Sequence, residues 1–232
     1  MANYKEIHGV KVQYRDSDAT AVEGDVWYNS ITSKLKMYVS LGSWASGGNV
    51  NTNLQNLGGC GIQTAAIKFG GYDPGGNKTV NESYDGSSWT EVADLNTGRR
   101  IMGSAGLQGA ALAIGGFVSG EVAVVESWDG SSWTEIADLN TARRTRGLGI
   151  QTSALAVGGA RPGYAAIVEK WDGSSWTEVG DLNTGRRDPG AMGTTAAGLV
   201  AGGDTGSATA NVETWDGSSW TETANINSAR YQ

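Results

Sequence analysis

The sequence predicts an all-β fold made of a repeated four-stranded unit, and three observations lead to this prediction. Tryptophans recur at intervals of 43 to 45 residues, at Trp44, Trp89, Trp133, Trp176 and Trp220. Glycine doublets recur in step with them, at Gly70-Gly71, Gly115-Gly116, Gly158-Gly159 and Gly202-Gly203. No segment shows the sustained periodicity of an amphipathic helix. Two sequence ladders with a common period indicate a tandem array of one structural unit.

Each unit is expected to contain four short strands, which in the second full unit cover residues 102–108, 110–115, 121–128 and 133–138. The third strand ends at Asp129-Gly130, a strong hairpin signal because both residue types tolerate positive φ. The same turn recurs at Asp85-Gly86, Asp172-Gly173 and Asp216-Gly217. The glycine doublet ends the second strand, at a place where β-branched residues would be strained. Repeated four-stranded units of this kind are typical of the blades of a β-propeller.

We predict five blades of four antiparallel strands, over about residues 24–52, 53–96, 97–140, 141–183 and 184–227. The first blade would take strands from residues 24–29 and 34–39, with Ser43-Trp44 opening its outer strand. Residues 1–23 form an N-terminal segment in which residues 10–15 offer the inner strand of this closing blade. Residues 228–232 are expected to latch onto the N-terminal blade and shield its edge. The alternative is four blades plus a separate N-terminal hairpin domain.

The blades resemble the kelch repeat, which also builds the central domain of galactose oxidase. The resemblance rests on the glycine doublets, on the aromatic residue before Asp-Gly and on the tryptophan five residues later, and it covers about residues 44–232. The aromatic residues are Tyr84, Trp128, Trp171 and Trp215. The repeat length also suits WD-type repeats, but no Gly-His precedes the Trp-Asp pairs, so we reject that reading. The resemblance implies a kelch-like propeller.

The N-terminal part of the chain resembles a motif of tailed-phage virion proteins, above all tail fibres. The residues that carry it are Gly24-Asp25-Val26-Trp27-Tyr28-Asn29-Ser30 and Lys34-Leu35-Lys36. Gln63-Thr64-Ala65-Ala66, followed by Gly70-Gly71, resembles repeat arrays encoded by marine phages. This resemblance implies a virion component that is made in the host cytoplasm. The N-terminal residues lack the apolar stretch of a signal peptide, as expected for such a protein.

Composition argues against several classes of function. The net charge of −7 and the pI near 4.7 speak against nucleic acid as a partner, since its phosphates require a basic face. No apolar run is long enough to cross a membrane as a helix. His8 and Cys60 are the only residues of their types, too few for a copper centre of the galactose-oxidase kind. Cys60 falls in an inner strand, level with Ala105 and Met192, and is expected to be a small buried apolar residue.

Catalysis by paired carboxylates finds equally little support. A glycosidase needs two carboxyl groups set across a cleft. The candidates recur in every blade, which indicates a structural role: Glu82, Glu126, Glu169 and Glu213. We therefore expect no catalytic residues, no cofactor and no metal, and a protein that is not an enzyme.

Tandem arginines recur where each blade passes to the next, at Arg99-Arg100, Arg143-Arg144 and Arg186-Arg187, with Arg230 in the last equivalent place. They could bind an anion or sugar hydroxyls, because the guanidinium presents a fork of donors. The alternative, which we favour, is that they tether blades through Asp94, Asp138, Asp181 or loop carbonyls. The repeated tryptophans and the aromatics before Asp-Gly are likewise expected to be packing residues.

The loops between the second and third strands differ from blade to blade and should emerge on the same face as the inter-blade linkers. Variable loops on a repeated scaffold form a natural binding surface. Our candidate ligand-binding residues are Tyr72, Phe117, Arg161 and Tyr164, with Arg100, Arg144 and Arg187 beneath them. We expect a non-enzymatic phage receptor-binding protein that recognises a host-surface glycan, with other virion proteins and further copies of the chain as partners. The alternatives are a free-standing lectin and a kelch-type protein-interaction module.

Overall fold

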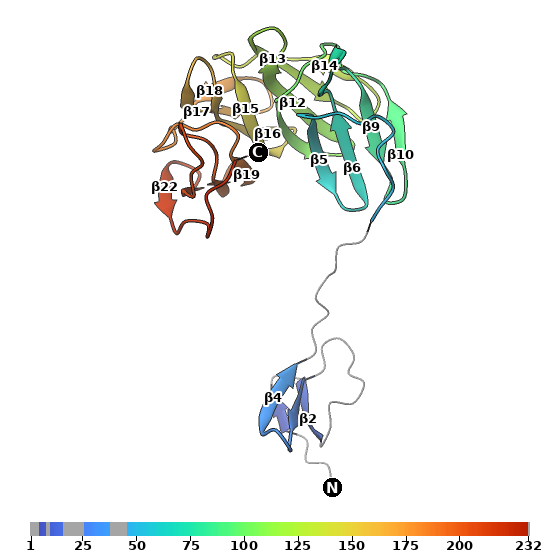
Figure 1. Cartoon of the computed structure of the whole chain (residues 1–232), viewed down its shortest axis with the longest axis vertical. Helices are drawn as coiled ribbons and strands as arrows, with labels where there is room; N and C mark the ends of the chain where they lie inside the picture. Colours follow the sequence, from blue (N-terminus) through green and yellow to red (C-terminus); the bar gives the residue numbers. More distant parts are fainter. Residues whose placement is uncertain (1–4, 8–9, 16–25, 38–45, 232) are drawn as a thin grey trace. The chain divides into compact units, whose positions relative to one another are not determined.

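The computed structural model describes residues 5–7, 10–15, 26–37 and 46–231, and every regular element in these ranges is a strand (Figure 1). The prediction of an all-β fold is confirmed. Among these residues no helix is long and apolar enough to span a membrane. The chain divides into two compact units, Met1–Ser46 and Gly47–Gln232.

The N-terminal unit contains one four-stranded sheet. Its strands, in sheet order, are β1 (Lys5–Ile7), β2 (Val10–Arg15), β3 (Val26–Asn29) and β4 (Lys34–Met37). Strands β3 and β4 form the expected antiparallel hairpin, whereas β2 and β3 run parallel. The connection over residues 16–25 is much longer than a tight hairpin turn, so it does not force the chain to return antiparallel.

The second unit consists of four antiparallel sheets of four strands each, which we number blades 1 to 4. Blade 1 contains β5 (Gly58–Ile62), β6 (Ala65–Phe69), β9 (Asn81–Tyr84) and β10 (Trp89–Val92). Blade 2 contains β11 (Gly103–Leu107), β12 (Ala110–Phe117), β13 (Glu121–Trp128) and β14 (Trp133–Glu135). Blade 3 contains β15 (Arg144–Ile150), β16 (Ser153–Ala160), β17 (Tyr164–Trp171) and β18 (Trp176–Glu178). Blade 4 contains β19 (Gly190–Gly193), β20 (Gly198–Ala201), β21 (Val212–Trp215) and β22 (Trp220–Thr223).

The blades follow one another along an arc in chain order, as in a β-propeller (Figure 1). Their inner strands pack in sequence, β5 on β11, β11 on β15 and β15 on β19. A small extra hairpin, β7 (Tyr72–Asp73) and β8 (Gly76–Asn77), lies in the loop between the second and third strands of blade 1. The four expected strands of the second full unit thus correspond to β11–β14.

The count of five blades is not confirmed. The structure describes four blades, and the blade expected over residues 24–52 is divided by the boundary after Ser46. The parallel pair β2–β3 also differs from the antiparallel order of a blade. The described topology agrees with the alternative of four blades and a separate N-terminal unit, although that unit is a full sheet. Ser43 and Trp44 lie outside the described residues.

The Asp-Gly turns close the third and fourth strands of every blade. In blade 2, Trp128 pairs with Trp133, and Gly130 has a φ of 96°. Asp129 Oδ1 accepts hydrogen bonds of 2.8 Å from the amides of Ser131 and Ser132. The Ser131 hydroxyl and these amides lower the pKa of Asp129 to about 2, because they stabilise the ionised carboxylate. The aspartate therefore fixes the turn as well as permitting it.

The glycine doublets lie at or directly after the end of the second strand of each blade, and in blades 2 and 3 they coincide with a bulge. The register between β12 and β13 shifts from Ile114 to Gly116, and both glycines of the doublet have positive φ. In blade 2, a Cβ built on Gly115 would lie 2.6 Å from the carbonyl oxygen of Arg143 in the linker to blade 3, and in blade 3 a Cβ built on Gly159 would lie 1.7 Å from that of Arg144, the first residue of β15. The doublet therefore lets the linker, the segment leading from one blade to the next, cross at backbone contact distance.

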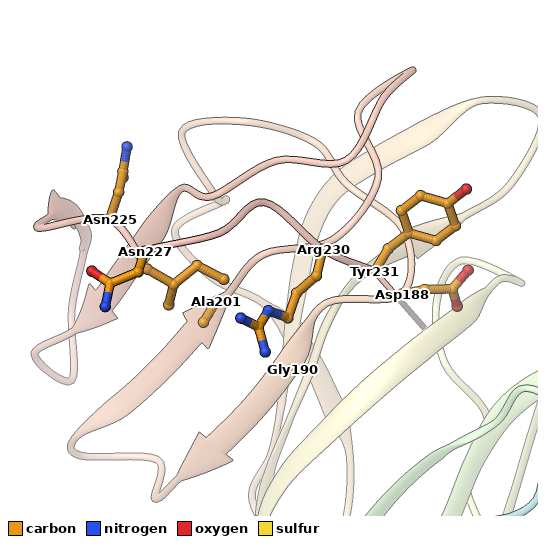
Figure 2. Close-up of a pocket in the computed structure, with 8 residues that line it drawn as sticks. Asp188, Gly190, Ala201, Asn225, Asn227, Arg230 and Tyr231 are labelled. Atoms are coloured by element: carbon orange, nitrogen blue, oxygen red, sulfur yellow. The ribbon is translucent and has the colours of Figure 1, made fainter.

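The C-terminal segment lies on blade 4 (Figure 2). Gly203 N donates to the carbonyl oxygen of Arg230 at 2.8 Å, as Gly116 N donates to that of Arg143 at 3.0 Å in blade 2. Arg230 N also donates to Thr209 at 3.2 Å. The described part of the expected latch, residues 228–231, is thus bonded to blade 4, and its docking onto the N-terminal blade stays a prediction.

Blade 1 is covered instead by the segment before it, residues 47–57. The amides of Asn51 and Thr52 each donate to the Glu82 carboxylate at 2.8 Å. Lys68 Nζ lies 2.8 Å from Glu82 Oε1 and donates to the Thr52 carbonyl at 3.0 Å. Burial acts to raise the pKa of Glu82, but these hydrogen bonds outweigh it and hold the pKa below its usual value. The segment therefore occupies the place that a preceding linker would take.

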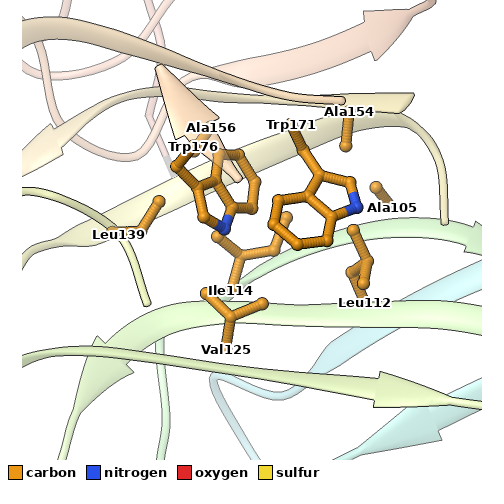
Figure 3. Packing of buried hydrophobic residues seen from close by; sticks show 9 residues of the cluster. All are labelled: Ala105, Leu112, Ile114, Val125, Leu139, Ala154, Ala156, Trp171 and Trp176. Atoms are coloured by element: carbon orange, nitrogen blue, oxygen red, sulfur yellow. The ribbon is translucent and has the colours of Figure 1, made fainter. Parts of the chain in front are cut away.

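Hydrophobic packing joins each blade to the next. Trp171 and Trp176 of blade 3, with ring centroids 5.4 Å apart, pack over Leu112, Ile114 and Val125 of blade 2 (Figure 3). The indole pairs of blades 2, 3 and 4 are at most 6% exposed, which confirms them as packing residues. The corresponding pair in blade 1, Tyr84 and Trp89, is only half-buried. The aromatic pairs therefore contribute buried apolar area to the contacts between blades.

Candidate functional site

The two arginines of each tandem pair have different surroundings. The first is fully buried between two blades. In the second linker, Arg143 donates to Glu169 of the next blade and to the carbonyl oxygen of Thr141 at 3.0 Å. It also donates to the carbonyl oxygens of Gly158 and Ala156 at 3.2 and 3.1 Å. These bonds occupy the guanidinium, so Arg143 is a tether between blades.

The preferred tether interpretation is correct for the first arginine, but the acidic partner was wrong. The buried pairs are Arg99–Glu126, Arg143–Glu169 and Arg186–Glu213. The aspartates that we expected as partners accept backbone amides within their own blade, as Asp138 does from Val125 at 3.3 Å. The pairs agree with the structural role expected for the recurring glutamates.

Donors of the preceding linker hold the glutamate of each of these pairs, four at Glu126 and Glu169 and three at Glu213. Glu169 Oε2 accepts from the amide and the Nδ2 of Asn140 at 2.7 and 2.8 Å. Its Oε1 accepts from the amide of Thr141 at 3.3 Å and from Arg143. Burial lowers the pKa of Arg143, and Glu169 opposes this shift. Such a site tolerates a buried charge only because every lone pair is used.

The second arginine of each pair lies on the loop face. Arg100 pairs through its backbone with Phe117, by hydrogen bonds of 3.1 and 2.8 Å. Its guanidinium lies 4.3 Å from the ring centroid of Tyr72 and 5.0 Å from that of Phe117. These distances permit cation–π contacts on both sides. Arg100 is therefore held between aromatic rings of blades 1 and 2.

The row of alternating rings and guanidinium groups continues along the array. Arg144 lies 5.6 Å from the Phe117 centroid and pairs with Glu121 at 3.1 Å. Arg187 lies 5.5 Å from the Tyr164 centroid and pairs with Asp204 at 2.6 Å. Hydrogen bonding to Asp204 keeps the pKa of Arg187 above its usual value. Six of the seven predicted residues thus belong to these stacked contacts.

A pocket opens within this row, with a volume of about 350 Å³. We call it the loop-face pocket. It is lined by Glu121, Arg144, Ala160, Arg161, Pro162, Gly163, Tyr164 and Arg187. Tyr164 is 42% exposed. Arg161 forms no ion pair among the described residues, whereas Arg144 and Arg187 each have an acidic partner. The pocket therefore offers an aromatic ring and one uncompensated cation.

The structure brings four predicted residues together in the loop-face pocket: Arg144, Arg161, Tyr164 and Arg187. Tyr72, Arg100 and Phe117 lie beside it along the stacked row. Tyr72 also lines a smaller pocket of about 280 Å³ with residues 53–55, Asp73 and Pro74. Sequence reasoning missed Glu121 and Asp204, the acids that hold two of the arginines. Both acids lie in or beside the variable loops, and this position could have indicated that they belong to the loop face.

The other candidate chemical groups lie elsewhere. Cys60 pairs with Ile67 in the register in which Ala105 pairs with Leu112, as expected, but it is half-buried. Burial raises the pKa of its thiol to about 12, so the reactive thiolate is suppressed. In the part of the chain that the structure describes, no cluster of His, Cys, Asp or Glu could hold a metal ion. His8 lies outside these residues.

No protein-family model matches the chain, and a search of curated proteins finds no match either. The ligand chemistry of the loop face is therefore inferred from the residues of the loop face alone. Guanidinium forks can bind a carboxylate or adjacent hydroxyl groups, and a half-exposed tyrosine ring can stack on an apolar ligand face.

Proposed function

We propose that this chain is a non-enzymatic binding module whose loop face recognises an acidic glycan. The observation that carries the proposal is the loop-face pocket, where the unpaired Arg161 lies beside the exposed ring of Tyr164. The ring would stack on the C–H face of a sugar, and the guanidinium would bind its carboxylate. The volume of about 350 Å³ lies within the usual range of small-ligand sites.

Charge favours an acidic ligand over a neutral one. Three arginines and one glutamate line the pocket, although the whole chain carries a net charge of −7. The overall negative charge opposes long-range attraction of an anion, so recognition would depend on contact within the pocket. Binding by one pocket would be weak, and several copies on one surface would strengthen it.

In this proposal the protein is a phage virion component, a tail-fibre or surface receptor-binding protein that meets host glycans. Support comes from the resemblance of residues 24–36 to phage structural proteins and of the blades to kelch repeats. Blades that share one scaffold and differ in their loops suit a surface that follows a changing receptor. The loops that differ most carry Tyr72, Phe117 and Tyr164.

A glycan array with acidic and neutral oligosaccharides tests the binding function. We expect acidic glycans to bind, and the signal to fall at least about tenfold in Arg161→Ala and in Tyr164→Ala, because each removes a principal contact. Tyr231→Ala, at an exposed tyrosine outside the pocket, is the matched control and should bind normally. Unchanged binding in both pocket variants would contradict the proposed face.

Mass spectrometry of purified phage particles tests the biological role separately. The protein should be present in the particles. Acidic-glycan binding by a protein that is absent from particles would indicate a free-standing lectin instead. Specific capture of a protein ligand with no glycan binding would favour an interaction module of the kelch kind.

A further inference from the structure

We infer that the loop-face pocket selects a sugar residue with a single carboxylate and rejects one that also carries a sulfate, with Asp204 and Glu121 as the residues that set this selectivity. The inference rests on the proposed function, because it concerns the ligand of the same pocket. The observation behind it is that three arginines line the pocket, and acidic side chains of the protein already pair with two of them.

Asp204 holds Arg187 through two nitrogens of the guanidinium. Asp204 Oδ2 lies 2.8 Å from Nε and 2.6 Å from Nη2 of Arg187. The backbones of the two residues also exchange hydrogen bonds of 3.0 and 2.8 Å. Asp204 Oδ1 accepts the amide of Gly206 at 2.8 Å. Both carboxylate oxygens are therefore in use, and the acid cannot move aside without leaving these donors unpaired.

A ligand that took Arg187 from Asp204 would leave a buried negative charge beside itself. The side chain of Asp204 is only 6% exposed, so the loss of its cation would be costly. The loop that carries Asp204 also borders the tyrosine ring, because a Cβ built on Gly206 would lie 3.8 Å from the hydroxyl oxygen of Tyr164. A second anion on this side of the pocket would therefore meet a carboxylate of like charge.

Glu121 compensates Arg144 and adds an acceptor to the wall of the pocket. Its Oε1 lies 3.1 Å from Nη2 of Arg144, and both side chains are partly exposed. A carboxylate accepts hydrogen bonds and donates none. Glu121 can therefore accept a hydrogen bond from a sugar hydroxyl, whereas a sulfate on that hydroxyl would remove the donor and add a like charge.

Arg161 is left to bind the one carboxylate. It is the first residue of the turn 161–163 between β16 and β17, across which Ala160 pairs with Tyr164. It is exposed, and among the described residues it has no acidic partner. The turn thus places one uncompensated guanidinium near the ring on which the sugar would stack. The charge of the pocket therefore matches a single carboxylate.

Matched oligosaccharides test this selectivity on the full chain. The probes differ only in their end residue, which is a neutral hexose, the corresponding uronic acid, or that uronic acid with one O-sulfate, each with gluco, galacto and manno configuration. NMR titration gives the Kd values. We expect the unmodified protein to bind its preferred uronic acid at least about tenfold more tightly than the sulfated form, because the sulfate finds no unpaired cation.

Two variants should weaken this discrimination by freeing an arginine. Asp204→Asn and Glu121→Gln each remove one negative charge at nearly constant shape, and each should lower the ratio of affinities for the two acidic probes at least about threefold. Glu222→Gln, at an exposed carboxylate of β22 outside the pocket lining, changes the net charge equally and should leave the ratio unchanged. Thermal unfolding checks that each variant folds, and Glu121→Gln, at a partly exposed pair, tests the claim even if Asp204→Asn does not fold.

Tighter binding of a sulfated probe by the unmodified protein would overturn the inference and leave the proposed acidic-glycan binding intact. An unchanged ratio in both variants would overturn it as well, because Asp204 and Glu121 would then not set the selectivity. Absence of binding by every acidic probe would overturn the proposed function, and this inference with it.

Discussion

At the scale of single residues, two adjacent arginines do different work because successive side chains of an extended linker point to opposite sides. Arg143 enters the interface between blades, and Arg144 lies on the loop face. The sequence predicted where the pair lies but could not separate its members, since both are arginine and recur together. The sequence also could not show which acid pairs with Arg143. The partner is the distant Glu169 and not Asp138, which lies nearer in the sequence.

Replacing the buried arginine should cost far more stability than replacing its neighbour. Arg143→Met leaves Glu169 buried without its cation, and should lower the free energy of unfolding by about 3–5 kcal/mol. Arg144→Met, at a partly exposed ion pair, should lower it by less than about 1 kcal/mol. Urea denaturation measures both changes, and similar losses in the two variants would contradict the division of roles.

A double variant separates the ion pair from packing. Arg143→Met combined with Glu169→Gln removes both charges, so the loss should be smaller than the sum of the two single losses. Additive losses would show that Arg143 and Glu169 stabilise the interface independently of each other.

The Asp-Gly turns should make stability depend on acidic pH. The pKa of Asp129, Asp172 and Asp216 is lowered to about 2 in the folded chain, first by the side-chain hydrogen bond of the serine two residues later. In the unfolded chain, the pKa of an aspartate is about 3.9. The stabilisation is therefore complete above about pH 4 and is lost as the pH falls towards 2. Asp172→Asn should show a shallower loss of stability than the unchanged protein between these pH values, by urea denaturation.

At the scale of elements, turn chemistry explains why strands were predictable. The Asp-Gly turns and glycine doublets mark where strands end, so the bounds of β11–β14 lie close to the predicted ranges. The N-terminal sheet was predicted less well, because the sequence between β2 and β3 contains no Asp-Gly or Gly-Gly pair. The parallel pairing of these strands and the strand β1 were missed. The hairpin β7–β8 was also missed, since it is a feature of one loop and does not repeat.

Two glycines of blade 3 separate close approach from backbone conformation alone. Gly159 and Gly163 have similar φ values, 114° and 102°, but only Gly159 would place a Cβ against another residue. Gly159→Ala should lower the free energy of unfolding by at least about 2 kcal/mol, and Gly163→Ala by about 1 kcal/mol. Thermal unfolding of both variants measures the difference. Equal losses would mean that the start of β15 does not depend on Gly159 for its close approach to β16.

At the scale of the whole molecule, the number and the ends of the blades could not be predicted from repetition alone. Residues 47–57 imitate a linker, and Lys68 provides the cation that Glu82 lacks from an arginine. This compensation comes from a different strand, so the repeat pattern gives no sign of it. The loop face was predicted because its residues vary, but the loop-face pocket depends on how Arg161 and Tyr164 fold beside Arg187.

Removal of residues 1–46 tests the division into units. The remaining chain, Gly47–Gln232, keeps all four blades and the segment that covers blade 1. It should retain a cooperative thermal transition with a Tm within about 3 °C of that of the full chain, monitored by circular dichroism. Loss of the transition would favour the five-blade interpretation, in which the N-terminal strands complete the array.

Binding at the loop-face pocket is the central claim, and an NMR titration of the labelled protein tests it most directly. The ligand is the acidic oligosaccharide with the strongest array signal, compared with its neutral counterpart. The proposal predicts saturable shifts in the amides of residues 160–164, with smaller shifts at Glu121, Arg144 and Arg187, and much weaker changes with the neutral sugar. Shifts confined to other surfaces, such as the end of blade 4 around Arg230, or equal responses to both sugars, would contradict it.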